Sequence, residues 1–598
     1  MVTTLKNNPF QITTPEDLSA AEMVSLFVDE YTDLPKIIYP GHVFIKGPRG
    51  VGKSMLLRFL RPDCQCLYYN KALSELEFLG VYIPLKNTNF SLTELRRLED
   101  VHACDILNEH LLACHCGAKV FEELLNLDLS DIQVDEARKY YHEVFIPLLY
   151  DNEASYGNID DCISVNDIFN RIKTIIARET RAISQYLRKI AFTPDILSYS
   201  GALYDYLDFL VPMLEGLTEI KGLPHKPVYL LIDDAHCLNQ TQTRVLNSWV
   251  GTRTSRRVSL KISTQYNYKT IYTISGHTID TPHDYTEVDM ATIYTGKEKS
   301  NYKDRVEKIV SKRLKAVALE KTPYEFFPVD EEQEQAIKLI GENYRKKFDI
   351  GEGRGYYRAD DALRYSRPDY IKSLAGKRKS SSKYSYSGFE QLVHLSSGVI
   401  RHFLHPAYLM YAQESANKQG KLIDHIESET QSQIVRKEAE DYLFDELDKL
   451  SNEGSDNAWP KSSVEKLRNL IQGLGGIFRN ILLSDKSERR VFSIALSSNV
   501  SEEVKTILDL GVQMGYFHKS TIGRKDSRSG GRTPLYVLNR RLAPIWNLDP
   551  TGFAGYLSIT DNTLVQLINN PFGYLRKLSE GDALLNDEME YIQLSIFD

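Results

Sequence analysis

Cysteine is scarce in this sequence, with seven residues in a chain of 598. A small, odd number of cysteines in a chain of this length does not predict a disulfide framework. Long apolar runs are also missing, since none reaches the roughly 18 residues that a membrane-spanning helix needs. Residues 1–18 lack the apolar core of a signal peptide. These absences predict a cytoplasmic protein without membrane contact.

An excess of positive charge is missing too. The formal net charge is −8 at pH 7, which argues against a protein covered by nucleic acid but leaves room for local basic patches. Hydrophobic residues make up 42% of the chain and charged residues 26%, as in ordinary globular proteins. The length predicts about three or four domains.

The most specific motif lies between an expected strand and an expected helix. Residues 42–46 (HVFIK) predict a buried strand, and residues 54–60 (SMLLRFL) predict a helix. Between them, GPRGVGKS at residues 47–54 fits the pattern G-x-x-x-x-G-K-[ST]. Such a turn presents backbone N–H groups to phosphate oxygens at the start of a helix. The motif therefore predicts a loop that binds a nucleoside triphosphate, with ATP and Mg²⁺ as the expected cofactors.

Individual positions of this loop have expected roles. We expect Lys53 to reach the β- and γ-phosphates and the Ser54 hydroxyl to bind Mg²⁺. The alternative is a glycine turn that only connects strand and helix. The expected nucleotide contacts are Gly47, Pro48, Arg49, Gly50, Val51, Gly52, Lys53, Ser54 and Met55.

A second apolar strand ends in two carboxylates. Residues 228–232 (VYLLI) predict a buried strand, and Asp233 and Asp234 follow it. We expect Asp233 to hold Mg²⁺ through water and Asp234 to orient the attacking water as the base. A chance acidic pair is the alternative. Many P-loop ATPases carry glutamate at the second position, so the shorter aspartate favours slow, switch-like hydrolysis.

A third strand is expected at residues 258–262, followed by polar residues. Thr264 is our candidate for contact with the γ-phosphate, and Gln265 is the alternative in the other register. Further strands are expected at residues 80–86 and 284–290. Five strands separated by helical segments predict an α/β fold with a doubly wound, mainly parallel five-stranded sheet.

A long helical insertion is expected at about residues 88–225, between the second and third strands. Its helical segments lie at residues 92–125, 134–149, 165–190 and 202–214. Residues 102–116 carry six histidines and cysteines. A packed helical core is the favoured interpretation of this cluster, and a zinc site is the alternative.

Two further segments precede the carboxyl-terminal part. Residues 389–413 predict a helix, a Ser-Ser-Gly break and a second helix that carries Arg401 near its start. Residues 350–384 contain nine Lys or Arg, four Asp or Glu and several tyrosines. A flexible solvated linker over about residues 348–388 is favoured there, and backbone tracking with base stacking on nucleic acid is the alternative.

The carboxyl-terminal part predicts a winged helix. A helix at residues 501–515 precedes a strand, a glycine-serine tip and a returning strand, and residues 516–541 hold seven Lys or Arg and one Asp. This basic hairpin predicts contact with double-stranded DNA, and a protein-docking module is the alternative. The candidate DNA contacts are Lys519, Arg524, Lys525, Arg528 and Arg532.

The chain resembles the origin-recognition-type AAA+ ATPases in five features. They are GPRGVGKS, LLIDDAH, the polar strand end, LSSGVIR and the expected winged helix. The resemblance covers residues 8–60, 228–290 and 389–548. Within that group the chain is most similar to bacterial members found in anti-phage defence islands, and it shares the Asp-Asp motif with STAND switch ATPases. The resemblance implies an ATPase core at residues 1–299, a helical lid at 300–425 and a winged-helix domain at 426–598.

The resemblance also implies roles for particular residues. Arg401 corresponds to the sensor 2 arginine of the lid, and the polar strand end to sensor 1. Candidates for an arginine finger, by position only, are Arg253, Arg256 and Arg257.

The expected function is an ATP-dependent switch that binds DNA or a partner on DNA. It would act in defence through a separate effector protein, with homo-oligomerisation as a further possibility. Two alternatives stay open: a replication or transposition initiator of the same fold, and a STAND-type signalling scaffold without DNA contact.

Overall fold

The computed structural model comprises two compact units. The P-loop unit comprises residues 13–290, and the C-terminal unit comprises residues 1–12 and 291–598. The structure describes residues 8–12, 15–28, 34–85, 103–155, 157–192, 198–252, 255–290, 299–349, 358–375, 383–418, 423–451, 459–486, 488–497, 499–523, 532–552, 555–579 and 591–593. None of the described helices is long and apolar enough to cross a membrane.

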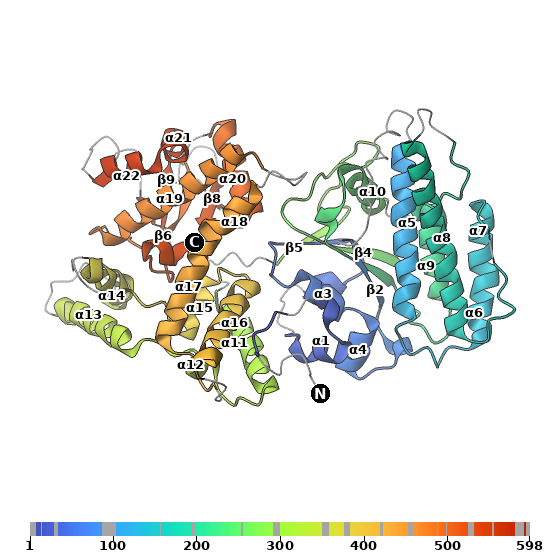
Figure 1. Ribbon diagram of the computed structural model, residues 1–598, viewed down its shortest axis with the longest axis horizontal. Helices are drawn as coiled ribbons and strands as arrows, with labels where there is room; N and C mark the ends of the chain where they lie inside the picture. Colours follow the sequence, from blue (N-terminus) through green and yellow to red (C-terminus); the bar gives the residue numbers. More distant parts are fainter. Residues whose placement is uncertain are drawn as a thin grey trace. The chain divides into compact units, whose positions relative to one another are not determined.

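The P-loop unit is built on one parallel sheet (Figure 1). Its five strands lie in the order β2-β3-β4-β1-β5, and every neighbouring pair is parallel. This confirms the predicted α/β fold and all five predicted strands. Because the strands are parallel, the loops after their carboxyl ends meet at one edge of the sheet. The strands are β1 (Val43–Lys46), β2 (Leu79–Pro84), β3 (Val228–Asp233), β4 (Val258–Thr264) and β5 (Thr286–Asp289).

Burial explains why these segments form central strands. Every residue of β3 and β4 is buried, as expected for a sheet covered on both faces. The polar residues of β4 are satisfied internally: Lys261 Nζ donates to the carbonyl oxygens of Tyr39 at 2.7 Å and Gly41 at 2.8 Å.

The shorter helices of the P-loop unit precede β1, connect β1 to β2, or connect β3 to β4. Two of them, α1 and α10, begin with side-chain caps; Asn239 forms a capping box with Gln242 at the start of α10. They are η1 (Pro15–Asp17), α1 (Ala20–Leu26), α2 (Leu34–Ile38), α3 (Lys53–Phe59), α4 (Pro62–Tyr69), η2 (Leu73–Glu75), η6 (Ala235–Cys237) and α10 (Gln240–Gly251).

The elements named between β2 and β3 in the described residues are all helices, joined by turns and loops, and the limits of the predicted insertion stay a prediction. Its two longest helices, α5 and α8, pack along each other (Figure 1). Their inner faces join the same hydrophobic core as the sheet. The elements are α5 (Ala103–Leu124), α6 (Val134–Tyr140), η4 (Tyr141–Phe145), α7 (Ile146–Asp151), α8 (Val165–Ala191), η5 (Tyr206–Leu210) and α9 (Val211–Leu217).

The cysteines and histidines of α5 belong to this packing. His110 accepts a hydrogen bond from the Tyr204 N–H at 2.6 Å through Nδ1, and its Nε2 lies 3.3 Å from Cys114 Sγ. Burial lowers the pKa of His110 to about 4. Among the described residues no group of three or more His, Cys, Asp or Glu could hold a metal ion. His102 lies outside those residues. The packed-core interpretation therefore accounts for the described part of the cluster.

The C-terminal unit combines a helical part with a mixed sheet. The sheet has the order β10-β9-β6-β8-β7, in which only the β6–β9 pair is parallel among the described strands. Its strands are β6 (Val491–Leu496), β7 (Phe517–Gly523), β8 (Arg532–Leu538), β9 (Gly555–Ile559) and β10 (Tyr591–Gln593). Its helices are α11 (Lys299–Ala316), α12 (Pro323–Phe326), α13 (Glu331–Asp349), α14 (Arg358–Ala375), α15 (Phe389–Leu395), α16 (Ile400–Asn417), α17 (Ser428–Leu443), α18 (Asp445–Leu450), α19 (Lys461–Leu483), α20 (Glu502–Gln513), η7 (Arg540–Trp546), α21 (Asp561–Asn569) and α22 (Pro571–Ser579).

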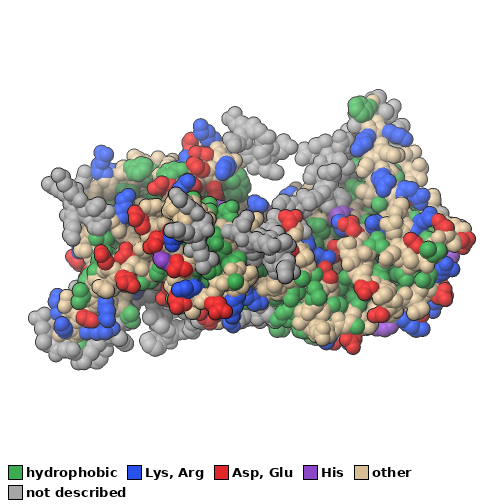
Figure 2. Space-filling view, turned by 60° about the horizontal axis from the view of Figure 1, so that its bottom comes forward, with side chains coloured by type: hydrophobic (Ala, Val, Ile, Leu, Met, Phe, Trp, Pro, Cys, Tyr) green, Lys and Arg blue, Asp and Glu red, His purple; other side chains and the backbone are tan. Residues whose placement is uncertain are grey.

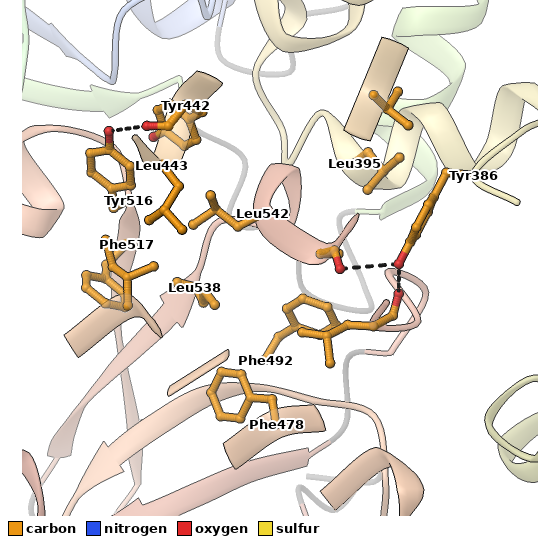
Figure 3. Close-up of a cluster of buried hydrophobic side chains, with 14 of the residues drawn as sticks. Tyr386, Leu395, Tyr442, Leu443, Phe478, Phe492, Tyr516, Phe517, Leu538 and Leu542 are labelled. Carbon is orange, nitrogen blue, oxygen red and sulfur yellow. Dashed lines mark hydrogen bonds between the residues drawn. The ribbon is translucent and has the colours of Figure 1, made fainter. Parts of the chain in front are cut away.

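One hydrophobic cluster runs through this unit and crosses the predicted boundary at residue 425 (Figure 3). The Tyr386 hydroxyl donates to the carbonyl oxygen of Leu548 at 2.8 Å. The Tyr442 and Tyr516 rings stack with centroids 4.4 Å apart, and the Tyr516 hydroxyl donates to the Tyr442 carbonyl oxygen at 2.7 Å. The predicted lid and C-terminal domain thus share a core. The domain limits inferred from the sequence stay a prediction.

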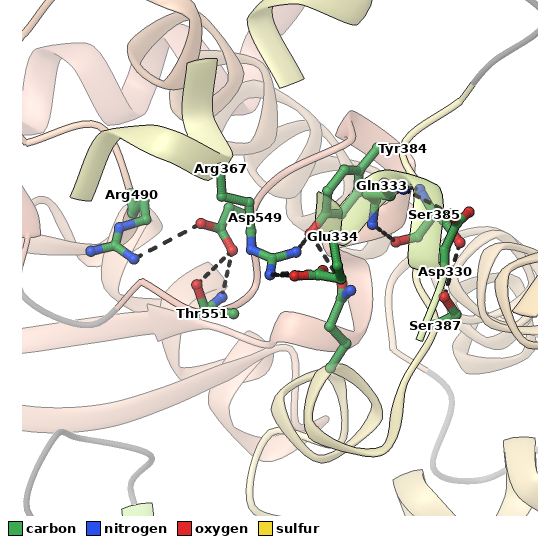
Figure 4. Close-up of polar contacts among 11 residues, drawn as sticks. Asp330, Gln333, Glu334, Arg367, Tyr384, Ser385, Ser387, Arg490, Asp549 and Thr551 are labelled. Carbon is green, nitrogen blue, oxygen red and sulfur yellow. Dashed lines mark hydrogen bonds and ion pairs between the residues drawn. The ribbon is translucent and has the colours of Figure 1, made fainter. Parts of the chain in front are cut away.

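The prediction of a flexible linker around residues 348–388 is wrong for the described part of that segment. Residues 358–375 form α14, which packs against α13. Arg367 Nη1 donates to the Tyr384 hydroxyl at 2.8 Å, and its Nη2 lies 2.9 Å from a Glu334 carboxylate oxygen (Figure 4). Arg489 lies over the Tyr365 ring at 5.2 Å. These contacts place Arg367, Tyr365 and Tyr384 in the packing of the unit, which argues against Tyr365 and Tyr384 as base-stacking residues. Tyr356 and Tyr357 lie outside the described residues.

The predicted carboxyl-terminal hairpin is present. Strands β7 and β8 pair antiparallel from Phe517–Leu538 to Gly523–Arg532, directly after α20. The tip at residues 524–531 lies outside the described residues. The winged-helix assignment stays a prediction.

Candidate nucleotide site

The loop after β1 has the backbone conformation that its glycines permit. Gly50 (φ 95°) and Gly52 (φ 103°) both lie in the left-handed region, which favours glycine. Gly52 is the N-cap of α3, so the loop ends where the helix begins. A residue with a side chain at either position would be strained. The local sequence therefore determines this turn.

Lys53 is folded over the loop that precedes it. The side chain is 6% exposed, and Nζ donates to the carbonyl oxygens of Gly47 at 2.7 Å and Pro48 at 3.0 Å. The ammonium group is thus held against the loop whose N–H groups are expected to receive phosphate.

Asp233 ends β3 as a buried, firmly held carboxylate. Its Oδ1 accepts from the Ser263 hydroxyl and from the Asp234 N–H at 3.0 Å. Its Oδ2 accepts from the Tyr82 hydroxyl at 2.8 Å. Tyr82 is itself covered by the Arg58 guanidinium, 5.1 Å from the ring centroid. Neighbouring strands β2 and β4 thus fix the carboxylate from both sides.

Asp234 has a different environment from its neighbour. Its side chain is 27% exposed, and its backbone lies in the left-handed region at φ 58°. A residue other than glycine in that region is uncommon, although aspartate tolerates it better than most. Its N–H also lies 3.1 Å from Ser263 Oγ. The turn separates the two carboxylates, with Asp233 directed into the sheet and Asp234 at the surface of its edge.

The end of β4 lies between the P-loop strand and the Asp strand. The register pairs Thr264 with Lys46 of β1 and Ile262 with Ile232 of β3. Thr264 is fully buried, and its hydroxyl donates to the Gln265 carbonyl oxygen at 3.1 Å. The Gln265 side chain instead reaches His236, with Nε2 to Nε2 at 2.7 Å.

His236 is a part of the site that the motifs did not single out. Its ring is 14% exposed, and Nδ1 lies 3.9 Å from Asp234 Oδ1. Burial, together with the positive charges of Lys53 and Arg49, lowers the pKa of His236 to about 4, against the opposing effect of Asp233. The ring is therefore neutral near pH 7. The only sequence signal was its position two residues after the carboxylate pair.

The comparison with protein families decides the affiliation. The family model described as ORC-CDC6-like matches residues 8–559. The chain belongs to the ORC-CDC6-like family. No curated protein matches the sequence. Membership confirms the predicted resemblance to origin-recognition-type AAA+ ATPases, a family of the replication-initiator type that in general uses ATP and Mg²⁺ and is associated with DNA.

For an ORC-CDC6-like protein, the described residues suit ATP and Mg²⁺. The P-loop offers the left-handed glycines and the Lys53 ammonium, and Asp233 offers a carboxylate at the same sheet edge. A magnesium ion prefers oxygen ligands and commonly combines one or two protein ligands with phosphate oxygens and water. Ser54 and Asp233 match that need, whereas the described residues form no larger metal cluster.

The structure brings some predicted residues together and leaves others apart. The P-loop, Asp233, Asp234 and Thr264 share one edge of one sheet. Arg401 lies at the start of α16 in the other unit, so its contact with nucleotide stays a prediction. Arg257 precedes β4, at the opposite edge of the sheet from the P-loop, and pairs with Glu219 at 2.6 Å. Arg253 lies outside the described residues.

The predicted DNA contacts also lie in the C-terminal unit. Lys519 Nζ is 3.5 Å from Asp509 Oδ1 and 5.6 Å from the Tyr536 ring centroid. Arg532 begins β8 and is exposed. Arg524, Lys525 and Arg528 lie outside the described residues. Elsewhere, acidic and basic side chains are interspersed on the face seen in Figure 2.

Proposed function

We propose that this protein is an ATP-hydrolysing switch that binds DNA or a DNA-associated partner. The observation that supports the proposal most directly is the convergence of four groups at one sheet edge. The P-loop lysine, a held carboxylate, a partly exposed carboxylate and a polar strand end meet there, contributed by Lys53, Asp233, Asp234 and Gln265.

Each group has a distinct proposed task. Lys53 would neutralise charge on the β- and γ-phosphates, and the loop N–H groups would orient them. Ser54 and Asp233 would hold Mg²⁺, which when bound supplies positive charge to the phosphates. Asp234, the more exposed carboxylate, would accept the proton of the attacking water. The contact with His236 favours Gln265 over Thr264 as the polar group that faces the phosphates, because the Thr264 hydroxyl is turned to the backbone.

The shared core of the C-terminal unit supports the switch. Helices of the predicted lid and the predicted DNA-binding hairpin contribute to one hydrophobic cluster. A displacement of α15 or α16 would therefore carry the hairpin with it, since packed interiors transmit strain rather than absorb it. We propose that nucleotide state acts on DNA or partner binding through this rigid connection, with Arg401 as the lid residue that responds to ATP.

We further propose that the protein acts in anti-phage defence with a separate effector protein. This rests on the resemblance of its motifs to defence-island members and on the absence, in the sequence, of a convincing nuclease, protease or deaminase motif. Genomic neighbours that encode an effector would support it. Specific binding to one origin-like sequence would instead favour a replication or transposition initiator, and full function after neutralisation of the hairpin would favour a signalling scaffold.

Lys53→Ala tests the nucleotide site. We expect loss of measurable ATP binding, because the variant lacks the cation that compensates the phosphate charge. Equilibrium binding of a fluorescent ATP analogue, in the presence of Mg²⁺, measures this. Lys36→Ala, on the exposed surface of α2, serves as the matched control and should bind as the wild type does. Equal affinity in the Lys53 variant would refute the site.

A further inference from the structure

Three side chains form a row between the end of β4 and the end of β3: Gln265, His236 and Asp234. Gln265, one residue beyond β4, places its amide Nε2 2.7 Å from His236 Nε2. On the other side of the ring, Nδ1 lies 3.9 Å from Asp234 Oδ1. Nδ1 is buried and has no hydrogen-bond partner among the described residues. The ring thus lies between the strand end that we assign to phosphate contact and the proposed base.

Hydrogen-bond chemistry determines which nitrogen carries the proton. An amide nitrogen can only donate, so His236 Nε2 must accept from Gln265. A neutral imidazole with an accepting Nε2 carries its proton on Nδ1. That N–H is directed to the side of the ring where Asp234 lies. The other neutral tautomer would place two N–H groups against each other and leave the carboxylate facing a lone pair.

The surroundings favour this neutral ring. Burial, Lys53, Arg49 and Lys269 all oppose a positive charge on His236, and Asp233 is the opposing influence. Cys237 Sγ lies 3.8 Å from Nε2 on the exposed side. The Gln265 amide therefore sets the ring orientation, and the ring in turn presents a single N–H to Asp234.

We propose that His236 is a positioning residue that couples Gln265 to Asp234. When Gln265 holds the ring, the Nδ1–H orients the Asp234 carboxylate for its role as base; when Gln265 shifts, that orientation is lost. The inference rests on the proposed ATP hydrolysis and deepens it by naming the connection between the strand end and the base. The 3.9 Å separation is longer than a hydrogen bond, so the two side chains must approach each other for the contact to form.

Variants of the full-length protein separate this role from simple packing. His236→Phe keeps the ring and removes both nitrogens. His236→Asn keeps an N–H donor near the position of Nδ1. Gln265→Leu keeps the side-chain volume and removes the amide. His283→Phe, at an exposed histidine of the same unit, is the matched control.

Three measurements report on the coupling: the Kd for a non-hydrolysable ATP analogue, and kcat and KM for ATP. We expect His236→Phe to lower kcat roughly 10- to 100-fold, which is part of the ~10²–10⁴-fold that a general base supplies, with Kd within about twofold of the wild type. His236→Asn should recover most of this loss. The double variant with Gln265→Leu should be no slower than His236→Phe alone, because both changes break the same chain.

A measurement without nucleotide tests the geometry itself. Nitrogen-15 spectra of histidine-labelled protein at pH 7, assigned by the signal lost in His236→Asn, should show a neutral ring protonated on Nδ1. A ring protonated on Nε2 would overturn the proposal, as would an unchanged kcat in His236→Phe or multiplicative effects of the two single variants. If the wild type itself neither binds nor hydrolyses ATP, the proposed function fails as well, and Lys53→Ala will then match the wild type.

Discussion

At the scale of single residues, two adjacent carboxylates have become chemically different. Asp233 is 1% exposed and receives hydrogen bonds from two neighbouring strands. Asp234 is turned away by its left-handed backbone and remains partly exposed. A buried carboxylate held by hydrogen bonds suits a fixed cation, whereas a base must be accessible to the attacking water. The difference in environment therefore supports the different roles we assign.

Asp234→Asn should retain ATP but nearly stop its hydrolysis. The amide keeps the shape of the carboxylate and loses the charge that accepts a proton, so kcat should fall by ~10²-fold or more. Release of inorganic phosphate at saturating ATP, together with analogue affinity, measures the two effects separately. Asp151→Asn, an exposed change on α7, is the control. Normal turnover in Asp234→Asn would move the base to another residue.

At the scale of elements, the hairpin of β7 and β8 carries all five candidate DNA contacts, and its two strands are described. The Lys519 ammonium group already contacts the Asp509 carboxylate and the Tyr536 ring. Arg532 is exposed at the start of β8. The remaining three candidate cations belong to the tip. If DNA binds here, the tip rather than the strands should supply most of the phosphate contacts.

Duplex affinity should depend strongly on salt. With three to five phosphate contacts, log K should fall against log salt with a slope of roughly −3 to −4.5. The triple change Arg524→Ala, Lys525→Ala and Arg528→Ala should flatten that slope by nearly three units, as expected from about 0.9 per contact. Affinities at several salt concentrations, with ATP bound, measure it.

A matched triple variant is available on α13. Arg345, Lys346 and Lys347 are exposed, so their replacement by alanine removes the same charge from the same unit. This control should reproduce the wild-type slope. Lines of equal slope and affinity for the tip variant and the wild type would make the hairpin a protein-docking surface, and the DNA interpretation would be abandoned.

At the scale of the whole molecule, both units bury neutral histidines. Burial lowers the pKa of four of them to about 4, and it lowers that of His402 well below its ordinary value; the four are His110, His115, His236 and His518. Their ordinary pKa is about 6.5. Between pH 4 and 6.5 the unfolded chain therefore binds more protons than the folded chain. Partly buried Glu109 and Glu123, whose pKa values are raised, act in the opposite direction at the lower end of this range.

Stability should consequently fall as the pH decreases from 6.5 toward 4. His115→Gln tests the origin of this loss, because the glutamine amide can donate to the Pro84 carbonyl oxygen as His115 Nε2 does at 3.2 Å, yet cannot titrate. Urea unfolding at pH 7.5 and pH 5 should show a smaller difference in the variant than in the wild type. His283→Gln, at an exposed position, should behave as the wild type. An equal pH dependence in all three proteins would assign the acid sensitivity to other groups.

The sequence by itself determined those elements that depend on residues close together in the chain. The five strands of the P-loop unit, the glycine turn, the paired carboxylates and the β7–β8 hairpin follow from apolar runs, left-handed glycines and spacing, all of which lie within a few residues of each other. The family affiliation followed from the same motifs. Such features can be predicted from the sequence because the backbone preferences that produce them depend mainly on adjacent side chains.

Only the tertiary structure decided which side chains meet. Tyr82 and Ser263 hold Asp233 from two different strands, and Gln265 reaches His236 across the same edge; no spacing in the chain indicates these contacts. The basic, tyrosine-rich segment at residues 358–375 was misjudged for the same reason. Its polarity predicted solvent, but α13 supplies a partner for its packing and Glu334 a partner for Arg367. Burial of a charge depends on the partner that the fold brings to it, and that partner can lie anywhere in the sequence.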